Sequence, residues 1–105
     1  MRLFGLFLLL ATSLVAQTTE ELFLDASTHY ENSDFDTALT VYQAIENTPI
    51  YSSDLYFNIA NCYYKTNNIA KAVLYYEKAL RLAPKDEDVL FNLKLVQLQL
   101  VDRLA

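Results

Sequence analysis

An acidic residue followed three positions later by phenylalanine occurs three times in this chain, at equal intervals. The pairs are Glu20 and Phe23, Asp54 and Phe57, and Asp88 and Phe91, and we call the interval between successive pairs the period. A period of roughly 20 to 50 residues is typical of solenoids, in which each repeat is one small unit of secondary structure stacked on the next. The interval therefore predicts a stack of equivalent units rather than one irregular domain.

The chain after residue 16 contains no glycine and only two prolines, Pro49 and Pro84. Strands need turn residues between them and an alternation of polar and apolar side chains, and neither pattern is visible. We therefore predict an all-α fold. The expected helices span residues 19–32, 34–46, 53–65, 69–82 and 86–104. The breaks between them hold Asn, Asp, Ser or Pro, which cap or stop helices.

The two complete units, residues 19–52 and 53–86, share residues of the same size at equivalent positions. The matched pairs include Ala26 with Ala60, Ala38 with Ala72, and Tyr42 with Tyr76. Alanine suits a position where two helix backbones approach closely, and tyrosine fills a wider gap. Each unit is thus expected to be a pair of packed helices.

The second unit resembles a tetratricopeptide repeat along most of its length, "YFNIANCYYKTNNIAKAVLYYEKALRLAP". The matching sites are Tyr56, Ile59, Ala60, Tyr63, Ala72, Tyr76, Ala79 and Pro84. Asn67 replaces the usual turn glycine, and asparagine is the next best residue for a left-handed backbone. The first unit matches less well, because Asp25, His29 and Ile50 replace a Leu, a Tyr and a Pro. The resemblance implies a helix-turn-helix solenoid with repeats at 19–52 and 53–86, and a capping or partial third-repeat helix at 87–104.

Residues 1–16 have the order of a secretory signal peptide: a positive charge at Arg2, an apolar run, then small residues. Cleavage is expected after Ala16, or alternatively after Ser13. An uncleaved anchor is the other interpretation, but the apolar stretch of about 13 residues is short against the roughly 20 that a bilayer needs. We therefore expect residues 17–105 to be exported to the periplasm or cell envelope.

The exported part carries a net charge near -6, from seven basic and thirteen acidic side chains once Arg2 is removed from the total of eight bases. Such a charge argues against nucleic acid and anionic lipid surfaces as partners. The acids concentrate in residues 19–52, which hold seven acids and no Lys or Arg, whereas residues 53–86 hold five bases and three acids. This asymmetry fits either ordinary solvated helix faces or head-to-tail contact between complementary ends.

The chain also resembles the amino-terminal part of the BatE-type aerotolerance proteins of Bacteroidetes. The shared motifs are "NCYYK", "LYYEKALRLAP", "DED", "NL" and "VDR", together with the export signal and two repeats. Members of that family usually continue into a membrane segment and a small carboxy-terminal barrel domain. The resemblance implies an envelope-associated assembly, with this chain either a fragment of such a protein or a minimal relative.

No catalytic constellation is recognisable in the sequence. There is no glycine-rich phosphate loop, no metal-spaced set of His and Cys, and no serine elbow. His29, the only histidine, is expected to have a packed structural role at a position where the repeat has a tyrosine. Cys62 is expected to be a small buried hydrophobic residue, with a reactive thiol as the alternative. The sequence therefore predicts a protein that is not an enzyme and needs no cofactor.

Repeats of this type bind peptides on the concave face, which is lined by the first helix of each unit. The three phenylalanines lie there, either as contacts to a peptide or as packing between neighbouring first helices. Asn side chains offer both a donor and an acceptor to a peptide backbone. The candidate partner-binding residues are Phe23, Phe57, Asn58, Asn61, Tyr64, Lys65, Phe91 and Asn92. A clamp for a terminal carboxylate is not expected, because Lys65 is the only base in the first helix of either complete unit.

The last helix carries apolar residues beyond one stripe, at Leu95, Leu98 and Val101. A capping helix should keep its outer face polar. Downstream chain, a second copy or a membrane-near partner is expected to cover it. The sequence thus favours an exported module that binds protein or peptide in an envelope assembly. The alternative is a structural segment of a membrane-anchored protein whose repeats self-associate.

Overall fold

The computed structural model describes residues 17–104 of the 105-residue chain. The predicted signal peptide, residues 1–16, lies outside the described residues. Within them, five helices follow one another: α2 (Thr19–Glu31), α3 (Phe35–Glu46), α4 (Ser53–Lys65), α5 (Ile69–Leu82) and α6 (Glu87–Leu104). The described residues form no strand, and the all-α prediction is confirmed. Every predicted helix boundary is correct to within one residue.

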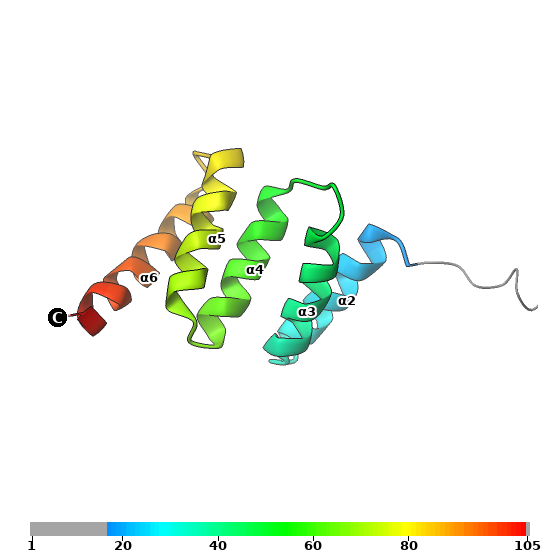
Figure 1. Ribbon diagram of the computed structural model, residues 1–105, viewed down its shortest axis with the longest axis horizontal. Coiled ribbons are helices and arrows are strands. Elements are labelled where there is room, and N and C mark those ends of the chain that lie inside the picture. The colour runs from blue at the N-terminus through cyan, green and yellow to red at the C-terminus, as the bar shows by residue number, and fades with distance from the viewer. Residues whose placement is uncertain (1–16, 105) are drawn as a thin grey trace, which may run out of the picture.

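The helices form a row in chain order, with α2 at one end and α6 at the other (Figure 1). Each helix packs against its neighbours in sequence, so α2 with α3 and α4 with α5 make two helical pairs, and α6 packs on α5. This is a helical-repeat architecture of two pairs and one further helix. None of the described helices combines the length and the apolar character required to cross a membrane.

Three helix starts are capped by side chains that stand one period apart. The Thr18 hydroxyl accepts a hydrogen bond from the amide of Glu21, and the Ser52 hydroxyl accepts one from Leu55, each at 3.2 Å. Asp86 Oδ1 accepts from the amide of Val89 at 3.2 Å. Such caps satisfy amides that have no partner inside the helix. The period of the sequence therefore sets where α2, α4 and α6 begin.

The turn inside each helical pair has the same backbone geometry. Asn67, between α4 and α5, has a φ of 67°, which confirms the left-handed conformation predicted for it. Ser33, at the equivalent position between α2 and α3, has a φ of 62°. Each of the two residues donates its amide to the carbonyl three positions earlier, Tyr30 or Tyr64. The two turns are therefore equivalent, although only the second has a residue suited to positive φ.

The core consists of alanines at the close helix contacts and larger apolar residues between them. Ala26, Ala38, Ala60 and Ala72 are fully buried, as their positions predicted. Cys62 is also fully buried, which confirms its expected role as a small hydrophobic residue. Burial raises the pKa of the Cys62 thiol to about 12, with a smaller contribution from the Asp36 charge. The thiol is therefore protonated and inert in the native state.

Hydrogen bonds join the first pair to the second through α3. Gln43 Nε2 donates to the Tyr63 hydroxyl at 3.1 Å. The Tyr75 hydroxyl donates to Glu46 Oε2 at 2.7 Å. Burial, followed by the bond to Glu46, raises the pKa of Tyr75, so this hydroxyl keeps its proton. These bonds fix the stacking of one unit on the next.

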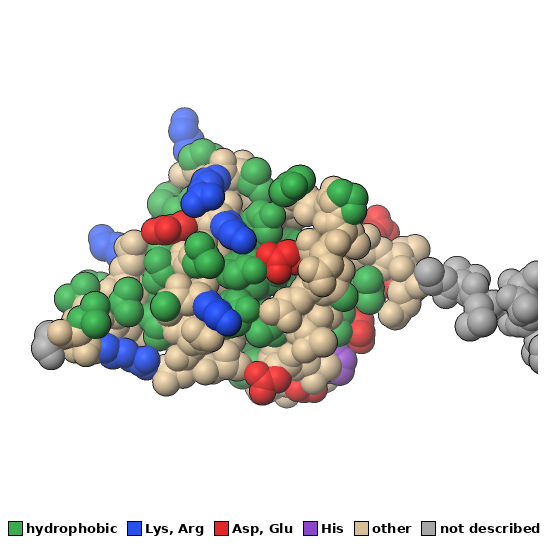
Figure 2. Space-filling model, viewed as in Figure 1, with side chains coloured by type: hydrophobic (Ala, Val, Ile, Leu, Met, Phe, Trp, Pro, Cys, Tyr) green, Lys and Arg blue, Asp and Glu red, His purple; other side chains and the backbone are tan. Residues whose placement is uncertain are grey.

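The charge asymmetry of the sequence is visible on the surface. On the face drawn in Figure 2, Lys and Arg side chains gather over the α5 and α6 half, and most Asp and Glu side chains lie over the α2 and α3 half. On this face the bases and most of the acids therefore lie over different halves of the row, whereas the first turn of α6 holds Glu87 and Asp88.

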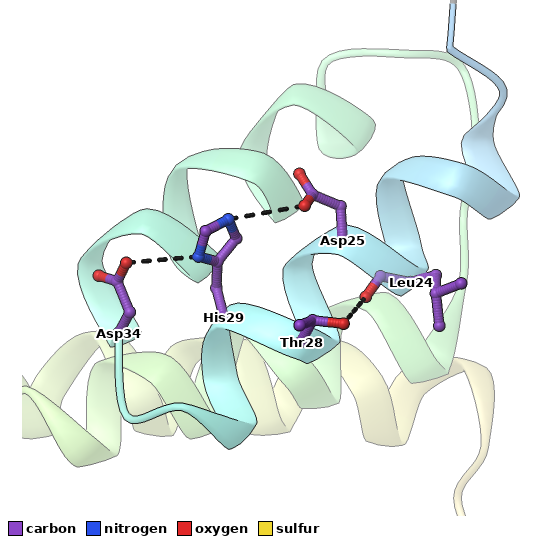
Figure 3. Close-up of polar contacts among 5 residues, drawn as sticks. All are labelled: Leu24, Asp25, Thr28, His29 and Asp34. Atoms are coloured by element: carbon purple, nitrogen blue, oxygen red, sulfur yellow. Dashed lines mark hydrogen bonds and ion pairs between the residues drawn. The ribbon is translucent and has the colours of Figure 1, made fainter.

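His29 differs from the packed role predicted for it, because its side chain is partly exposed. The imidazole points toward Asp25 on one side and Asp34 on the other (Figure 3). Its Nε2 is 3.5 Å from Asp25 Oδ1, and its Nδ1 is 3.3 Å from Asp34 Oδ2. The equivalent Tyr63 is covered by Lys71 and Tyr75 of α5. The first unit has the shorter Thr37 and Val41 at those two positions, which leaves the imidazole accessible.

Candidate functional site

A pocket of about 240 Å³ opens among α2, α4, α5 and α6. The lining residues are Tyr30, Asn61, Tyr64, Lys65, Tyr76, Asn92, Leu95 and Val96. Seven of them come from α2, α4 and α6, the first helices of the three units, and Tyr76 comes from α5. The pocket therefore lies on the face that the sequence assigned to partner binding.

The floor of the pocket is a hydrogen-bonded set of three side chains. Asn61 Oδ1 accepts from the Tyr76 hydroxyl, and also from Asn92 Nδ2 at 3.1 Å. Tyr76 is only 1% exposed, and burial raises its pKa, so its hydroxyl remains a donor. These bonds fix the rotamers of both asparagines, which is a requirement for a preorganised binding site.

The asparagine pair leaves one amide nitrogen and one amide oxygen free. Among the described residues, neither Nδ2 of Asn61 nor Oδ1 of Asn92 has a hydrogen-bond partner. A peptide group offers one carbonyl acceptor and one amide donor. The two free amide atoms therefore match the hydrogen-bonding groups of an extended peptide backbone.

Two further hydrogen bonds join α6 to this side of the pocket, one to α4 and one to the turn that follows α4. The Tyr64 hydroxyl accepts from Gln99 Nε2 at 3.1 Å. Asn67 Oδ1 accepts from Arg103 Nη2. With the Asn61–Asn92 bond, these contacts form a row of three polar cross-links, which we call the α4–α6 ladder. The ladder holds one wall of the pocket against the other.

Lys65 supplies the charge of the pocket. Its side chain is exposed. Both ion pairs found among the described residues involve His29, so no carboxylate of these residues lies within 4.0 Å of the Lys65 ammonium group. The opposite wall contains Leu95 and Val96, which are apolar. The pocket can therefore receive an acidic group at one side and an apolar side chain at the other.

Half of the residues predicted for partner binding meet in this pocket, namely Asn61, Tyr64, Lys65 and Asn92. Phe23, Phe57, Asn58 and Phe91 do not line it. The Phe23 ring packs edge-on against Tyr42 at 5.5 Å between centroids, and the Phe57 ring packs against Tyr76 at 5.9 Å. These two contacts favour the packing interpretation for the first two phenylalanines. Phe91 is different, because it is 64% exposed.

Four lining residues were not predicted: Tyr30, Tyr76, Leu95 and Val96. The period could have indicated two of them, since Tyr30 stands one period before Tyr64 and Leu95 stands one period after Asn61. Tyr76 was assigned to the core alone. Its ring is indeed buried, but its hydroxyl reaches the pocket floor. The spacing of residues along the sequence does not predict this, because it does not define the direction of a side chain.

The arrangement is suited to noncovalent binding. The described residues contain no group of three or more His, Cys, Asp or Glu side chains that could hold a metal ion. The single thiol is buried and protonated, and no nucleophile and base are paired in the pocket. Amides, hydroxyls and one ammonium group can position a ligand by hydrogen bonds and charge.

Comparison with known proteins supports the repeat interpretation. Residues 53–86 match the family model described as Tetratricopeptide repeat, whose members are in general protein-interaction modules. Over 67 residues, 64% of this chain, the sequence is 37% identical to the Bos taurus protein named BBSome complex member BBS4. The chain spans 13% of the length of that protein.

Proposed function

We propose that this chain, whose second helical pair matches the tetratricopeptide repeat, is a non-enzymatic module that binds an extended segment of a protein partner. The segment lies in the pocket between α4 and α6. The observation that carries this proposal is the Asn61–Asn92 pair, which is held by internal hydrogen bonds and still offers one free amide nitrogen and one free amide oxygen.

The pocket also defines which side chains the segment should carry. An acidic side chain would pair with Lys65, whose ammonium group forms no ion pair with a carboxylate of the described residues. An apolar side chain would lie against Leu95 and Val96. Because one cation lines the pocket, an internal acidic residue fits better than a terminal carboxylate held by several bases.

The setting that we propose is the periplasm or cell envelope, with the chain as part of a larger assembly near the membrane. The order of charge, apolar run and small residues in 1–16 supports export. The motifs shared with BatE-type proteins support an envelope assembly and a role related to aerotolerance. The mammalian relative is itself named as a member of a complex, which is consistent with a scaffold role.

A second candidate function is structural. In this alternative the chain is the amino-terminal segment of a membrane-anchored protein, and its repeats mediate self-association through the last helix. The exposed apolar residues of α6, including Leu95, Leu98 and Val101, favour it.

A peptide-display selection on the immobilised full chain tests the binding function. We expect enriched peptides to share an acidic residue near an apolar one. Lys65→Glu should weaken their binding at least about tenfold, because it replaces an attractive charge pair by a repulsive one. Lys85→Glu is the matched control, since Lys85 is an exposed lysine outside the pocket. Binding that is unchanged in Lys65→Glu and in Asn92→Ala would exclude this pocket as the site.

A further inference from the structure

The outer surface of α6 is the most apolar exposed region of the described chain. Six of the eleven exposed large hydrophobic residues belong to this one helix: Leu90, Phe91, Leu95, Leu98, Val101 and Leu104. Single exposed apolar residues are common, but a contiguous set marks an interaction surface. Phe91, Leu95, Leu98 and Val101 follow one another at spacings of four, three and three, so they form one stripe along the helix. We call this set the α6 stripe.

The two complete units show what normally covers such a stripe. In the first, Phe23 packs on Tyr42 of α3, and the Tyr42 hydroxyl is 3.0 Å from Ser27 Oγ. In the second, Phe57 packs on Tyr76 of α5, whose hydroxyl bonds to Asn61. Phe91 and Leu95 occupy the same two positions of α6. A helix is therefore the element that fits the α6 stripe.

Two residues of α6 restrict what that helix can carry. Leu95 stands where Ser27 and Asn61 bind a tyrosine hydroxyl, so a hydroxyl in the same place would be buried without a partner. Lys94 stands where Ala26 and Ala60 allow the closest backbone approach. The occupant therefore packs at a greater distance than α3 or α5 does, and presents aliphatic or phenylalanine side chains rather than tyrosine.

The α6 helix itself meets these requirements. Its stripe contains Phe91 and three aliphatic residues and no hydroxyl, and the exposed Lys94 beside them has a stem long enough to keep its ammonium group in water. The opposite end of the row does not, because the exposed surface of α2 presents Glu20, Glu21 and Glu31 around one apolar residue, Leu24. A head-to-tail stack would place the α6 stripe against these carboxylates, at a cost in desolvation. Of the two end helices of the row, α6 is therefore the better complement to the stripe.

We infer that two copies of this chain associate through α6, with the two helices antiparallel and related by a two-fold axis. In a parallel pair the acidic first turns, which hold Glu87 and Asp88, would lie beside each other. In an antiparallel pair each acidic turn lies beside the other copy's last turn, where the charges of Asp102 and Arg103 balance, and the helix dipoles oppose. Leu95 also lines the peptide pocket, so the second copy borders that pocket. This inference rests on the self-association through α6 proposed above and assigns it an orientation.

Sedimentation equilibrium of the full chain tests the pairing. We expect a concentration-dependent monomer–dimer equilibrium, and a dissociation constant at least about tenfold higher for Leu98→Glu, because a carboxylate would be buried at the centre of the stripe. The matched control is Leu24→Glu, at an exposed leucine of α2, which should leave the equilibrium unchanged. Circular dichroism checks that both variants keep the helical fold.

Disulfide trapping tests the orientation of the two copies. Leu98→Cys lies near the proposed two-fold axis and should form a cross-linked dimer on mild oxidation, whereas Leu24→Cys should not. Phe91→Cys lies away from that axis and should not be trapped either, because the two copies of residue 91 meet only in a parallel pair, and its trapping would overturn the antiparallel arrangement. A chain that is monomeric at every concentration overturns both self-association and the pairing. A dimer that survives Leu98→Glu, or that is trapped through Leu24→Cys, overturns the α6 pairing but leaves self-association standing. Lower stability of Leu98→Glu without a change in mass would show that another segment covers the stripe, and overturns the pairing as well.

Discussion

Ser33 and Asn67 lie one period apart and adopt the same left-handed backbone conformation, with φ values of 62° and 67°. Asparagine tolerates this conformation better than serine does, and glycine tolerates it best. The first turn therefore holds a strain that the second relieves by its residue type. The same backbone is imposed by the repeat in both places.

Replacing Ser33 by glycine should raise the free energy of unfolding by about 0.5 to 1 kcal/mol, because relief of the left-handed strain exceeds the added entropy of the unfolded chain. Urea denaturation followed by circular dichroism measures the change. Ser33→Val is the opposing variant and should destabilise the chain, since a branched side chain is least compatible with positive φ. Equal stabilities for the two variants would contradict this account of the turn.

The exposed and the packed phenylalanines should respond differently to truncation. Phe57→Ala should lower the free energy of unfolding by about 2 kcal/mol, because it removes the ring that packs on Tyr76. Phe91→Ala should change it by less than about 0.5 kcal/mol when measured at a concentration where the chain is monomeric. Comparable losses for both would mean that Phe91 is covered within the chain.

The Tyr76 hydroxyl should contribute to the fold through its bond to Asn61. Tyr76→Phe removes that donor and should cost about 1 kcal/mol. Tyr51→Phe is the control, since Tyr51 is 81% exposed and should have no measurable effect. Thermal and urea unfolding of the two variants provide the comparison, and a neutral Tyr76→Phe would show that Asn61 is satisfied by Asn92 alone.

Cys62 should make stability fall at high pH. Burial raises its pKa to about 12, above the ordinary value of a thiol, so the unfolded chain loses the proton first. The stabilisation from the buried, protonated thiol is fully present below the ordinary thiol pKa and is lost as the pH rises from there toward about 12. Between pH 7 and pH 10 the free energy of unfolding should fall by about 1 kcal/mol more in the wild type than in Cys62→Ala. The same burial should make alkylation of the native thiol slow, with a rate that rises on addition of urea.

The helices and the alanine contacts could be predicted from the sequence because both follow from the period. Residues at equivalent positions must be similar in size when equivalent helices pack, so the match between Ala38 and Ala72 predicts a close helix contact in both units. The pocket was predictable only in part. Asn61 and Asn92 are polar and lie on the expected face, whereas Tyr76 reaches the pocket by its hydroxyl while its ring remains in the core.

His29 shows where prediction from the period fails. Its position predicts packing, because the equivalent Tyr63 is covered by Lys71 and Tyr75. The first unit has Thr37 and Val41 in place of these two residues, and the imidazole pairs with Asp25 and Asp34 instead. A single position cannot report this, since the environment of a side chain depends on residues from another helix.

The capping residues Thr18, Ser52 and Asp86 divide the chain into interchangeable blocks. Ser52 and Asp86 each end one unit, and all three residues open the helix that follows with a side-chain oxygen, so the starts of the three units are chemically alike. The block from Ser52 to Lys85 begins at one such residue and ends immediately before another. A molecule of this design can gain or lose length in whole blocks while the start of each following helix stays capped, and only the contacts between neighbouring blocks have to adjust.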